Sequence, residues 1–348
     1  MSAGSRRDSR RDRTIAVFGA TGHTGRFVVS ELLRRGIAPI AVGRDAAKLA
    51  ECGFADRGIE VREASIDDAG SLDRAFVGAA AVVSCAGPFL DTAHAVASAA
   101  LRTSIHYVDV TAEQVSARAT FEAFDEPART AGVVVIPAMG FYGGFADLLV
   151  TTAMGDWDAA DEIKIGIALD SWHPTQGTRI TGERNTAQRM VVAGGLLVPL
   201  PQPAPETDWD FPEPFARQAV IELPFSEIVV IARHLRTSGL HTYLSQNALR
   251  DIRDPTPPPP EPVDEAGLSA QRFLVEAIVR RGDRTRRIIA QGRDIYAFSA
   301  PLVCEAVQRI LDAKVRDNGA QAPGAIFDAR DFLSALAQHH LTSVVTGG

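Results

Sequence analysis

FGATGHTGR, residues 18–26, is the stretch that decides the fold of this chain. It follows a short apolar run and precedes an amphipathic stretch, so its three glycines lie where a strand turns into a helix. In such a turn the first glycine permits the tight bend, the second lets the backbone approach a pyrophosphate, and the third lets the helix pack closely on the strand. The N-terminus of the helix then offers free N–H groups and a partial positive charge to phosphate.

This spacing predicts a dinucleotide-binding turn; the alternative is a vestigial turn of the same shape in a protein that binds no cofactor. The residues expected to contact the cofactor here are Gly19, Ala20, Thr21, Gly22, His23, Thr24 and Gly25.

The pattern around this turn repeats from residue 14 to residue 137, as short apolar runs separated by helical stretches such as 24–35 and 92–101. Strands that alternate with helices of this length indicate βαβ units and a parallel sheet, and right-handed crossovers then make the sheet doubly wound. We therefore expect an α/β protein with a Rossmann domain over 14–137. Its strands are predicted at 14–18, 39–42, 60–63, 81–85, 106–110 and 133–136.

The rhythm changes after residue 137. Residues 161–169 alternate as a strand with one exposed face, and 272–280 and 284–289 flank the turn residues Gly282-Asp283 as a hairpin. Proline and acidic residues predict loops at 199–214 and 254–262. These features predict a second, mixed α+β substrate domain over 138–300. Residues 1–13 are expected to be a disordered tail, and 301–348, with helical spacing at 301–312 and 329–337, C-terminal helices that pack back on the Rossmann domain.

The end of the second predicted strand indicates which dinucleotide is bound. NAD sites usually carry an acidic residue there, whereas this chain has Arg44, whose guanidinium can pair bidentately with a 2′-phosphate. We therefore expect NADP(H) to be preferred over NAD(H), although the neighbouring Asp45 weakens the argument. The alternative is that Arg44 is a solvated surface residue.

Two further segments are expected at the cofactor. Asp67 follows the third strand, where a carboxylate accepts from the adenine amino group; helix N-capping is the alternative. After the fourth strand, the glycine and proline of the next loop let the backbone pass close to the nicotinamide ribose. The predicted contact residues of that loop are Ala86, Gly87, Pro88 and Phe89.

Several motifs resemble those of the saccharopine dehydrogenase-like reductases. They are GATGHTG at 19–25, VSCAGPF at 83–89, HYVDVTAE at 106–113, GFYGGFADL at 140–148 and GRDIYAFSAP at 292–301. The resemblance spans about residues 14–315 and is closest to the branch of trans-acting enoyl reductases, which act with polyketide or lipid synthases. It implies a Rossmann domain, NADP(H) and a mixed substrate domain. The chain departs from the family at Tyr142-Gly143-Gly144, where an Asp-Ser-type pair is frequent.

The scarcity of lysine excludes one mechanism. Ordinary short-chain dehydrogenases use Tyr-x-x-x-Lys, in which the lysine lowers the pKa of the tyrosine. The chain has only Lys48, Lys164 and Lys314, and none has a tyrosine four residues before it. GxSxG, HExxH, CxxC and Walker motifs are also absent from the sequence, so we expect no metal site of the usual spacing.

The proton donor is left to other side chains. We predict Tyr142, at the domain junction, and His173, in the loop after 161–169, as candidate catalytic residues. The alternatives are junction packing for Tyr142 and an exposed loop position for His173. Arg184 is a further candidate for an acidic substrate group, with a solvated helix face as its alternative.

Composition restricts the partners. The net charge of −7 argues against binding to nucleic acid. The sequence contains no run of 18 apolar residues, so it predicts no membrane span. Three scattered cysteines indicate a reduced, cytoplasmic protein. The segment 272–293 has seven arginines and two acids, a basic surface suited to an acidic acyl-carrier protein. A homodimer is also compatible with the sequence.

These observations predict an NAD(P)H-dependent oxidoreductase that reduces a C=C (enoyl) or C=N bond of a small organic or acyl substrate, bound between the two domains. One alternative is a saccharopine-type dehydrogenase that forms or cleaves a secondary amine. The other is a non-catalytic protein that senses NADP.

Overall fold

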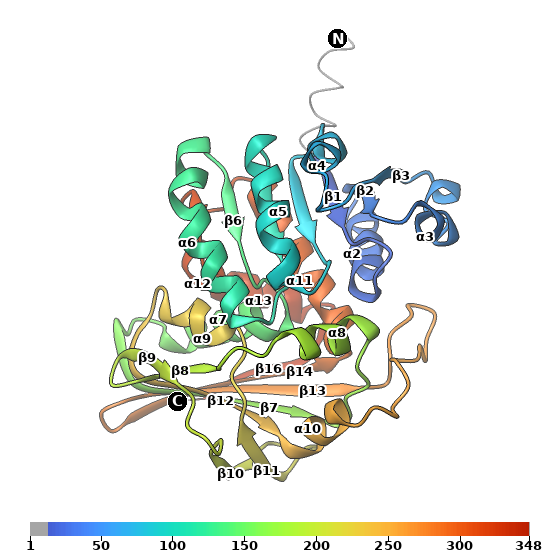
Figure 1. Ribbon diagram of the computed structural model, residues 1–348. Coiled ribbons are helices and arrows are strands. Elements are labelled where there is room, and N and C mark those ends of the chain that lie inside the picture. Colours follow the sequence, from blue (N-terminus) through green and yellow to red (C-terminus); the bar gives the residue numbers. More distant parts are fainter. Residues whose placement is uncertain (1–12, 348) are drawn as a thin grey trace. The chain divides into compact units, whose positions relative to one another are not determined.

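The computed structural model of the protein describes residues 13–347 (Figure 1). Most of the predicted tail, 1–12, lies outside the described residues. The chain divides into two compact units. The first contains the described residues up to Thr111, Ser116–Gly140 and Ser299–Gln321, and the second contains Ala112–Val115, Phe141–Phe298 and the residues from Ala322 onward.

The first unit is built on a parallel sheet of seven strands in the order β15-β6-β5-β4-β1-β2-β3, and every neighbouring pair in it is parallel. The predicted Rossmann sheet is therefore confirmed. Its strands are β1 (Thr14–Phe18), β2 (Ala38–Gly43), β3 (Glu60–Glu63), β4 (Ala81–Ser84), β5 (His106–Asp109), β6 (Val134–Ile136) and β15 (Gly319–Ala320).

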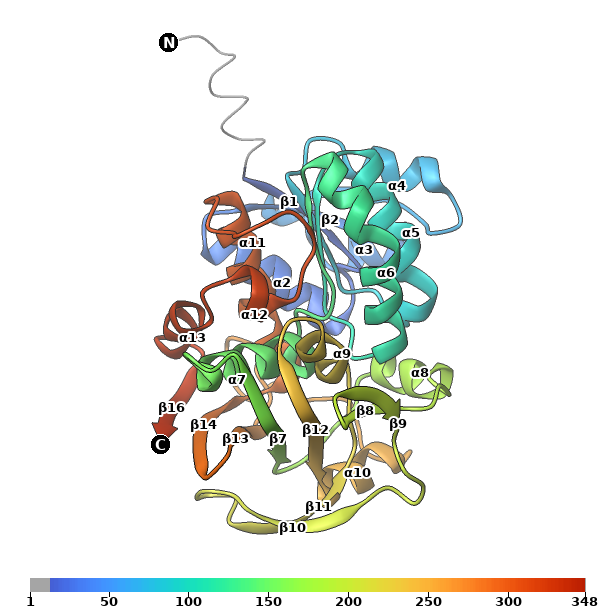
Figure 2. The same cartoon turned by 90° about the vertical axis from the view of Figure 1, so that its left-hand side faces the viewer.

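Helices cover both faces of this sheet. Figure 2 shows α5 and α6 on one face and α2 and α11 on the other, which is the doubly wound arrangement. Because both faces are covered, the central strands are continuous apolar runs such as TIAVF in β1 and AVVS in β4. The helices are α2 (His23–Arg34), α3 (Ala46–Glu51), α4 (Ala69–Phe76), α5 (Phe89–Arg102), α6 (Gln114–Ala131) and α11 (Ile295–Leu311).

The boundary between the units falls inside α11, close to Pro301. In the first unit this helix is joined to the end of α2, because Arg35 donates to Glu305 at 2.6 Å and to Gln308 at 2.9 Å. Residues from Ala322 onward, which we expected on the Rossmann domain, belong instead to the second unit. The reason is long-range pairing: β16 (Leu341–Gly347) forms an antiparallel ladder with β14 (Arg284–Arg293), and helical spacing alone does not indicate such a partner.

The second unit has a mixed sheet of nine strands, as predicted. Its main path runs β10-β11-β12-β7-β13-β14-β16, with β8 and β9 attached to β12; β12 and β7 are parallel and the other pairs are antiparallel. The strands not yet given are β7 (Ala159–Leu169), β8 (Met190–Ala193), β9 (Leu196–Pro199), β10 (Glu206–Asp210), β11 (Arg217–Glu222), β12 (Arg236–Ser245) and β13 (Arg272–Arg281).

The helices of this unit are short. They are the π-helical segment η2 (Phe141–Phe145), α7 (Ala146–Met154), α8 (Gln176–Arg184), α9 (Glu227–Ala232), α10 (Gln246–Arg253), α12 (Pro323–Ile326) and α13 (Ala329–Ala337). One prediction here is wrong: 199–214 is not all loop, since it contains β10. Trp209 of this edge strand is buried and packs with Phe211 and Phe215. The prolines on either side of β10 led to the prediction of a loop. An edge strand tolerates proline, so their presence does not exclude a strand there.

Candidate functional site

The glycine turn closes tightly at the carboxyl end of β1. Gly19 has φ +83°, and the backbone N–H groups of Gly19 and Ala20 both donate to Val42 O, at 2.9 and 3.1 Å. A Cβ atom at Gly25 would lie 2.2 Å from Gly19 O. The first and third glycines are thus required by backbone geometry, as the spacing predicts.

The second glycine leaves the start of α2 open. Gly22 is the extended N-cap residue, and no side chain of the described part of the chain caps the helix. Gly22 is exposed, and a Cβ there would project into the turn, 3.2 Å from Gly19 O. Uncapped N–H groups at a bare glycine turn fit the diphosphate of a dinucleotide.

Arg44 lies just beyond β2 and is exposed, with no hydrogen bond or ion pair to any residue in 13–347. The neighbouring Asp45 is already engaged: its carboxylate is the N-cap of α3 and accepts from Lys48 N at 3.1 Å. The acidic residue that weakened the case for NADP therefore has a local structural role. Arg44 remains the group at this strand end suited to a phosphate.

The loop after β4 adjoins the glycine turn. A Cβ at Gly19 would lie 2.9 Å from both Cβ and N of Ala86. Thr92 Oγ1 donates to Ala86 O at 2.6 Å, which fixes the loop, and Pro88 and Phe89 begin α5. Among the predicted cofactor residues, the turn and this loop are thus brought together at the carboxyl ends of β1 and β4.

Asp67 stands after β3 and is exposed; it accepts from Ser65 Oγ at 3.2 Å. The alternative prediction for this position is helix N-capping. That role belongs to the neighbouring Asp68, which caps α4 by accepting from Ser71 N at 3.1 Å. Asp67 itself therefore stays a predicted cofactor residue.

Asp109, at the end of β5, is fully buried. Its carboxylate accepts from Thr111 N at 2.9 Å, Ala138 N at 2.8 Å and Tyr107 Oη at 2.8 Å. Burial raises its pKa to about 6, against the three hydrogen bonds, which lower it. The carboxylate therefore ties together the segments that follow β5 and β6.

Tyr142 lies in the second unit, in a kink of η2 where Gly143 has φ +120°. Its ring is stacked on Trp172, with centroids 5.5 Å apart, and lies 4.2 Å from the ring of Phe225. The backbone is held by Ser226 Oγ, which donates to Tyr142 O at 2.9 Å. The hydroxyl is buried and has no hydrogen-bond partner among the described residues.

Polar groups surround this aromatic cluster. Burial raises the pKa of Tyr142 well above its usual value, and the nearby Tyr296 and Glu227 raise it further, against Arg189. Burial also raises the pKa of Glu227, whose carboxyl accepts from Phe225 N at 2.8 Å. Tyr296 Oη accepts from Trp172 Nε1 at 2.8 Å.

Sequence reasoning missed most of this cluster. Tyr296 lies in the GRDIYAFSAP segment and offered a signal. Trp172, Arg189 and Phe225 come from loops and Glu227 from the start of α9, and none of these four belongs to a motif. His173 follows Trp172 directly in the loop between β7 and α8 and is half-buried. Arg184 ends α8 and is exposed.

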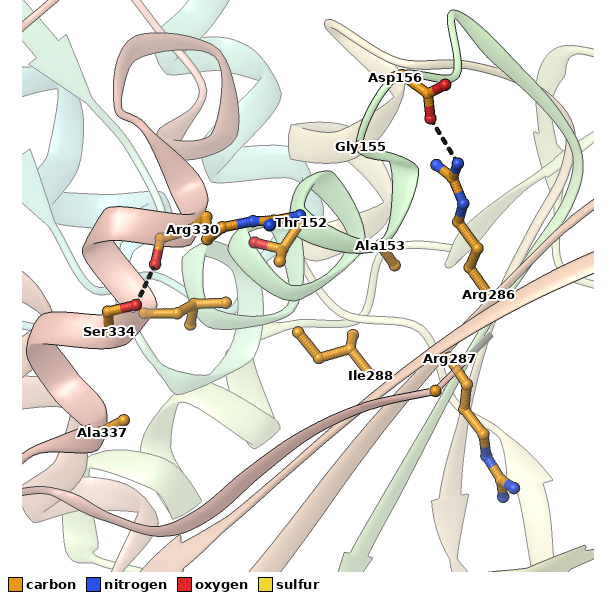
Figure 3. A pocket seen from close by; sticks show the side chains of 12 residues that line it. Thr152, Ala153, Gly155, Asp156, Arg286, Arg287, Ile288, Arg330, Ser334 and Ala337 are labelled. Atoms are coloured by element: carbon orange, nitrogen blue, oxygen red, sulfur yellow. Dashed lines mark hydrogen bonds and ion pairs between the residues drawn. The ribbon is translucent and has the colours of Figure 1, made fainter.

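The predicted basic hairpin is largely neutralised. Six of its seven arginines have a carboxylate within 4 Å; the pairs are Arg272–Asp170, Arg280–Asp161, Arg281–Asp158, Arg286–Asp156, Arg287–Glu276 and Arg293–Asp264. Figure 3 shows the Arg286–Asp156 pair at a cavity of about 810 Å³ between α7, β14 and α13. None of the predicted site residues lines that cavity.

Metal binding and membrane insertion are considered for the described residues. No group of three or more His, Cys, Asp or Glu side chains in 13–347 is arranged to hold a metal ion. No helix in that range combines the length and apolar composition needed to cross a membrane.

Residues 19–156 match a protein-family model described as NAD(P)H-binding. The matched range contains the glycine turn, Arg44 and the loop after β4. No curated protein matches the chain.

Among solved structures, the chain is similar to saccharopine dehydrogenase (L-Glu forming) from Saccharomyces cerevisiae, with a TM-score of 0.67 and 12% identity over 97% of this chain and 100% of that one. A partial match is triphenylmethane reductase of Citrobacter sp. complexed with NADP(H), with a TM-score of 0.30 and 21% identity over 50% of this chain and 64% of that one. The fold is therefore that of saccharopine dehydrogenase. The family match adds NAD(P)H binding for residues 19–156.

Proposed function

We propose that this protein is an NADPH-dependent reductase of a C=C (enoyl) or C=N bond in a small organic or acyl substrate. The observation that carries the proposal is the uncapped start of α2 behind a turn whose first and third glycines leave no room for a Cβ atom. That turn sits at the carboxyl edge of a doubly wound parallel sheet, where such sheets bind their ligands.

In this proposal, different residues of the first unit bind different parts of the cofactor. Residues 19–25 and the start of α2 hold the diphosphate, Arg44 the 2′-phosphate and Asp67 the adenine. Residues 86–89 lie along the nicotinamide end. A bound nicotinamide supplies or accepts a hydride, and the protein must orient it and move one proton.

Tyr142 is the proposed proton donor. Its raised pKa keeps the phenol protonated at neutral pH, the form that donates. Its hydroxyl is uncommitted to any described residue and is therefore available to a substrate atom. His173, next to the stacking partner of Tyr142, is the second candidate.

NADPH oxidation with paired substrates tests the proposal. Enoyl thioesters should be reduced, whereas oxidation only with a keto acid plus an amine would indicate the saccharopine-type alternative. Tyr142→Phe should lower kcat by roughly 100-fold, the contribution of one general acid, with NADPH affinity unchanged. Tyr243→Phe is the matched control, since Tyr243 lies in β12, packed near Trp209. Tight NADPH binding without turnover on the whole panel would instead favour an NADP sensor.

The partners and cellular location stay predictions: an acyl-carrier protein, a homodimer and the cytoplasm. The carrier is best tested at Arg284, the hairpin arginine without a carboxylate partner among the described residues. Arg284→Gln should raise KM for a carrier-bound substrate and leave KM for a small free substrate unchanged. An equal change for both substrates would argue against a carrier.

A further inference from the structure

We propose that Arg189 is the anion-binding residue of the Tyr142 site, and that the substrate bears one carboxylate on an otherwise apolar body. This inference rests on the proposed function, because it names the substrate class of the same site.

Arg189 immediately precedes β8 and is half-buried. Its guanidinium donates to Pro224 O at 2.5 Å and lies 4.9 Å from the centroid of the Phe225 ring. No carboxylate of the described chain lies within ion-pair distance of it. Burial lowers its pKa, and the charge of Glu227 acts in the opposite direction.

Two other arginines with little exposed side chain have carboxylate partners. Arg35, with a side chain 11% exposed, binds Glu31 at 2.7 Å and Glu305 at 2.6 Å. Arg309, 8% exposed, binds Glu305 at 2.8 Å. Removing a guanidinium from water without an anion is costly, so an uncompensated one marks a place where a ligand supplies the negative charge.

Tyr142 adds a second donor at the same place. Arg189 and Tyr142 both lie against Phe225, and the Tyr142 hydroxyl is buried without a partner among residues 13–347. Glu227 acts on Arg189 electrostatically and raises its pKa against burial, but no ion pair joins the two side chains among the described residues. Within the described residues the guanidinium has one acceptor, Pro224 O, and the Tyr142 hydroxyl has none, so a carboxylate, with two acceptor oxygens and a charge, complements the pair.

The rest of the cluster restricts the body of the substrate. Trp172 is 2% exposed and Phe225 8%, so the surroundings are aromatic and apolar. Tyr296 Oη is already engaged by Trp172 and by Thr178 Oγ1 at 2.9 Å. Arg189 is the one basic residue among these described neighbours, so the cluster matches a single carboxylate and lacks the second cation that a dicarboxylate requires.

The test compares trans-2-octenoate with its amide, trans-2-octenamide, which has the same body without the charge. Calorimetry on the full chain without cofactor should show the acid binding at least tenfold more tightly than the amide. Arg189→Gln should abolish that difference by weakening only the acid, and Arg189→Lys should retain part of it. Arg250→Gln, at an exposed arginine of α10, is the charge-matched control. Thermal melts establish that each variant is folded.

Two results would overturn the inference: a persistent preference for the acid in folded Arg189→Gln, or tighter binding of glutarate than of octenoate. NADPH oxidation separates this outcome from the proposed function. Equal oxidation with acid and amide would leave the reductase standing and remove the role of Arg189. Arg189-dependent binding of octenoate without any NADPH oxidation would support the anion site and count against the reductase.

Discussion

The glycine turn and the Tyr142 cluster are two sites built in opposite ways. The turn consists of backbone atoms of consecutive residues, and it works because side chains are absent at Gly19, Gly22 and Gly25. The cluster consists of side chains from five separated segments, around residues 142, 172, 189, 225–227 and 296. A site made of backbone atoms can therefore be recognised from a short sequence motif, whereas a site made of side chains from distant segments exists only once the fold has formed.

The largest expected effect breaks the turn. Gly25→Ala should raise the Kd for NADPH roughly 100-fold, because the Cβ cannot sit 2.2 Å from Gly19 O and the displaced helix start loses charge-assisted hydrogen bonds of about 1.5–3 kcal/mol each. Fluorescence titration with NADPH measures this. Gly182→Ala in α8 is the control, because a Cβ there meets nothing within 4 Å. Unchanged affinity in Gly25→Ala would show that the turn does not hold the cofactor.

The second effect concerns the buried carboxyl of Asp109 at the end of β5. Because the folded-state pKa of Asp109 is about 6 and unfolded aspartate titrates near pH ~3.9, the folded protein binds the extra proton between these values. Asp109 should therefore cost stability as pH rises from 4 to 6, by about 3 kcal/mol in all. Asp109→Asn should lose this slope in denaturant melts at a series of pH values. Parallel stability curves for the two proteins would contradict the assignment.

The third effect tests whether a packing change in the second unit leaves NADPH affinity unchanged. A Cβ at Gly166 of β7 would lie 2.5 Å from Trp209 Cε2. Gly166→Ala should lower the free energy of unfolding by roughly 1–3 kcal/mol through overpacking. NADPH affinity should stay within about twofold, since the contact lies outside the turn. Loss of cofactor binding in a folded Gly166→Ala protein would mean that the two sites are not independent.

The smallest effect sharpens the cofactor assignment. Arg44→Asp should weaken NADPH relative to NADH by about tenfold, the value of one lost charge-assisted pair. Arg57→Asp makes the same charge change at another exposed arginine of the first unit and should leave the ratio alone. If both variants shift the ratio equally, Arg44 acts through general electrostatics and does not bind the 2′-phosphate.

Most strands of the Rossmann sheet were predictable, because parallel strands covered on both faces are uninterrupted apolar runs bounded by turns. Thr14–Phe18 and Glu60–Glu63 have the predicted limits. β10 was not predictable, since the burial of Trp209 depends on residues of distant strands, among them Ala168 of β7 and Leu274 of β13. The placement of Ala322 onward failed for a similar reason: β16 pairs with β14 about fifty residues earlier.

The sequence by itself determined the nucleotide-binding architecture, because glycine spacing and apolar periodicity act over a few residues and leave a direct trace in the chain. It also determined which mechanism was excluded, since three lysines without a partner tyrosine suffice for that. Only the tertiary structure decided that the hairpin arginines are paired, and that Arg189 and Tyr142, whose hydroxyl has no partner among the described residues, both lie against Phe225. Charge compensation and desolvation are properties of neighbours in space, and no local pattern encodes them.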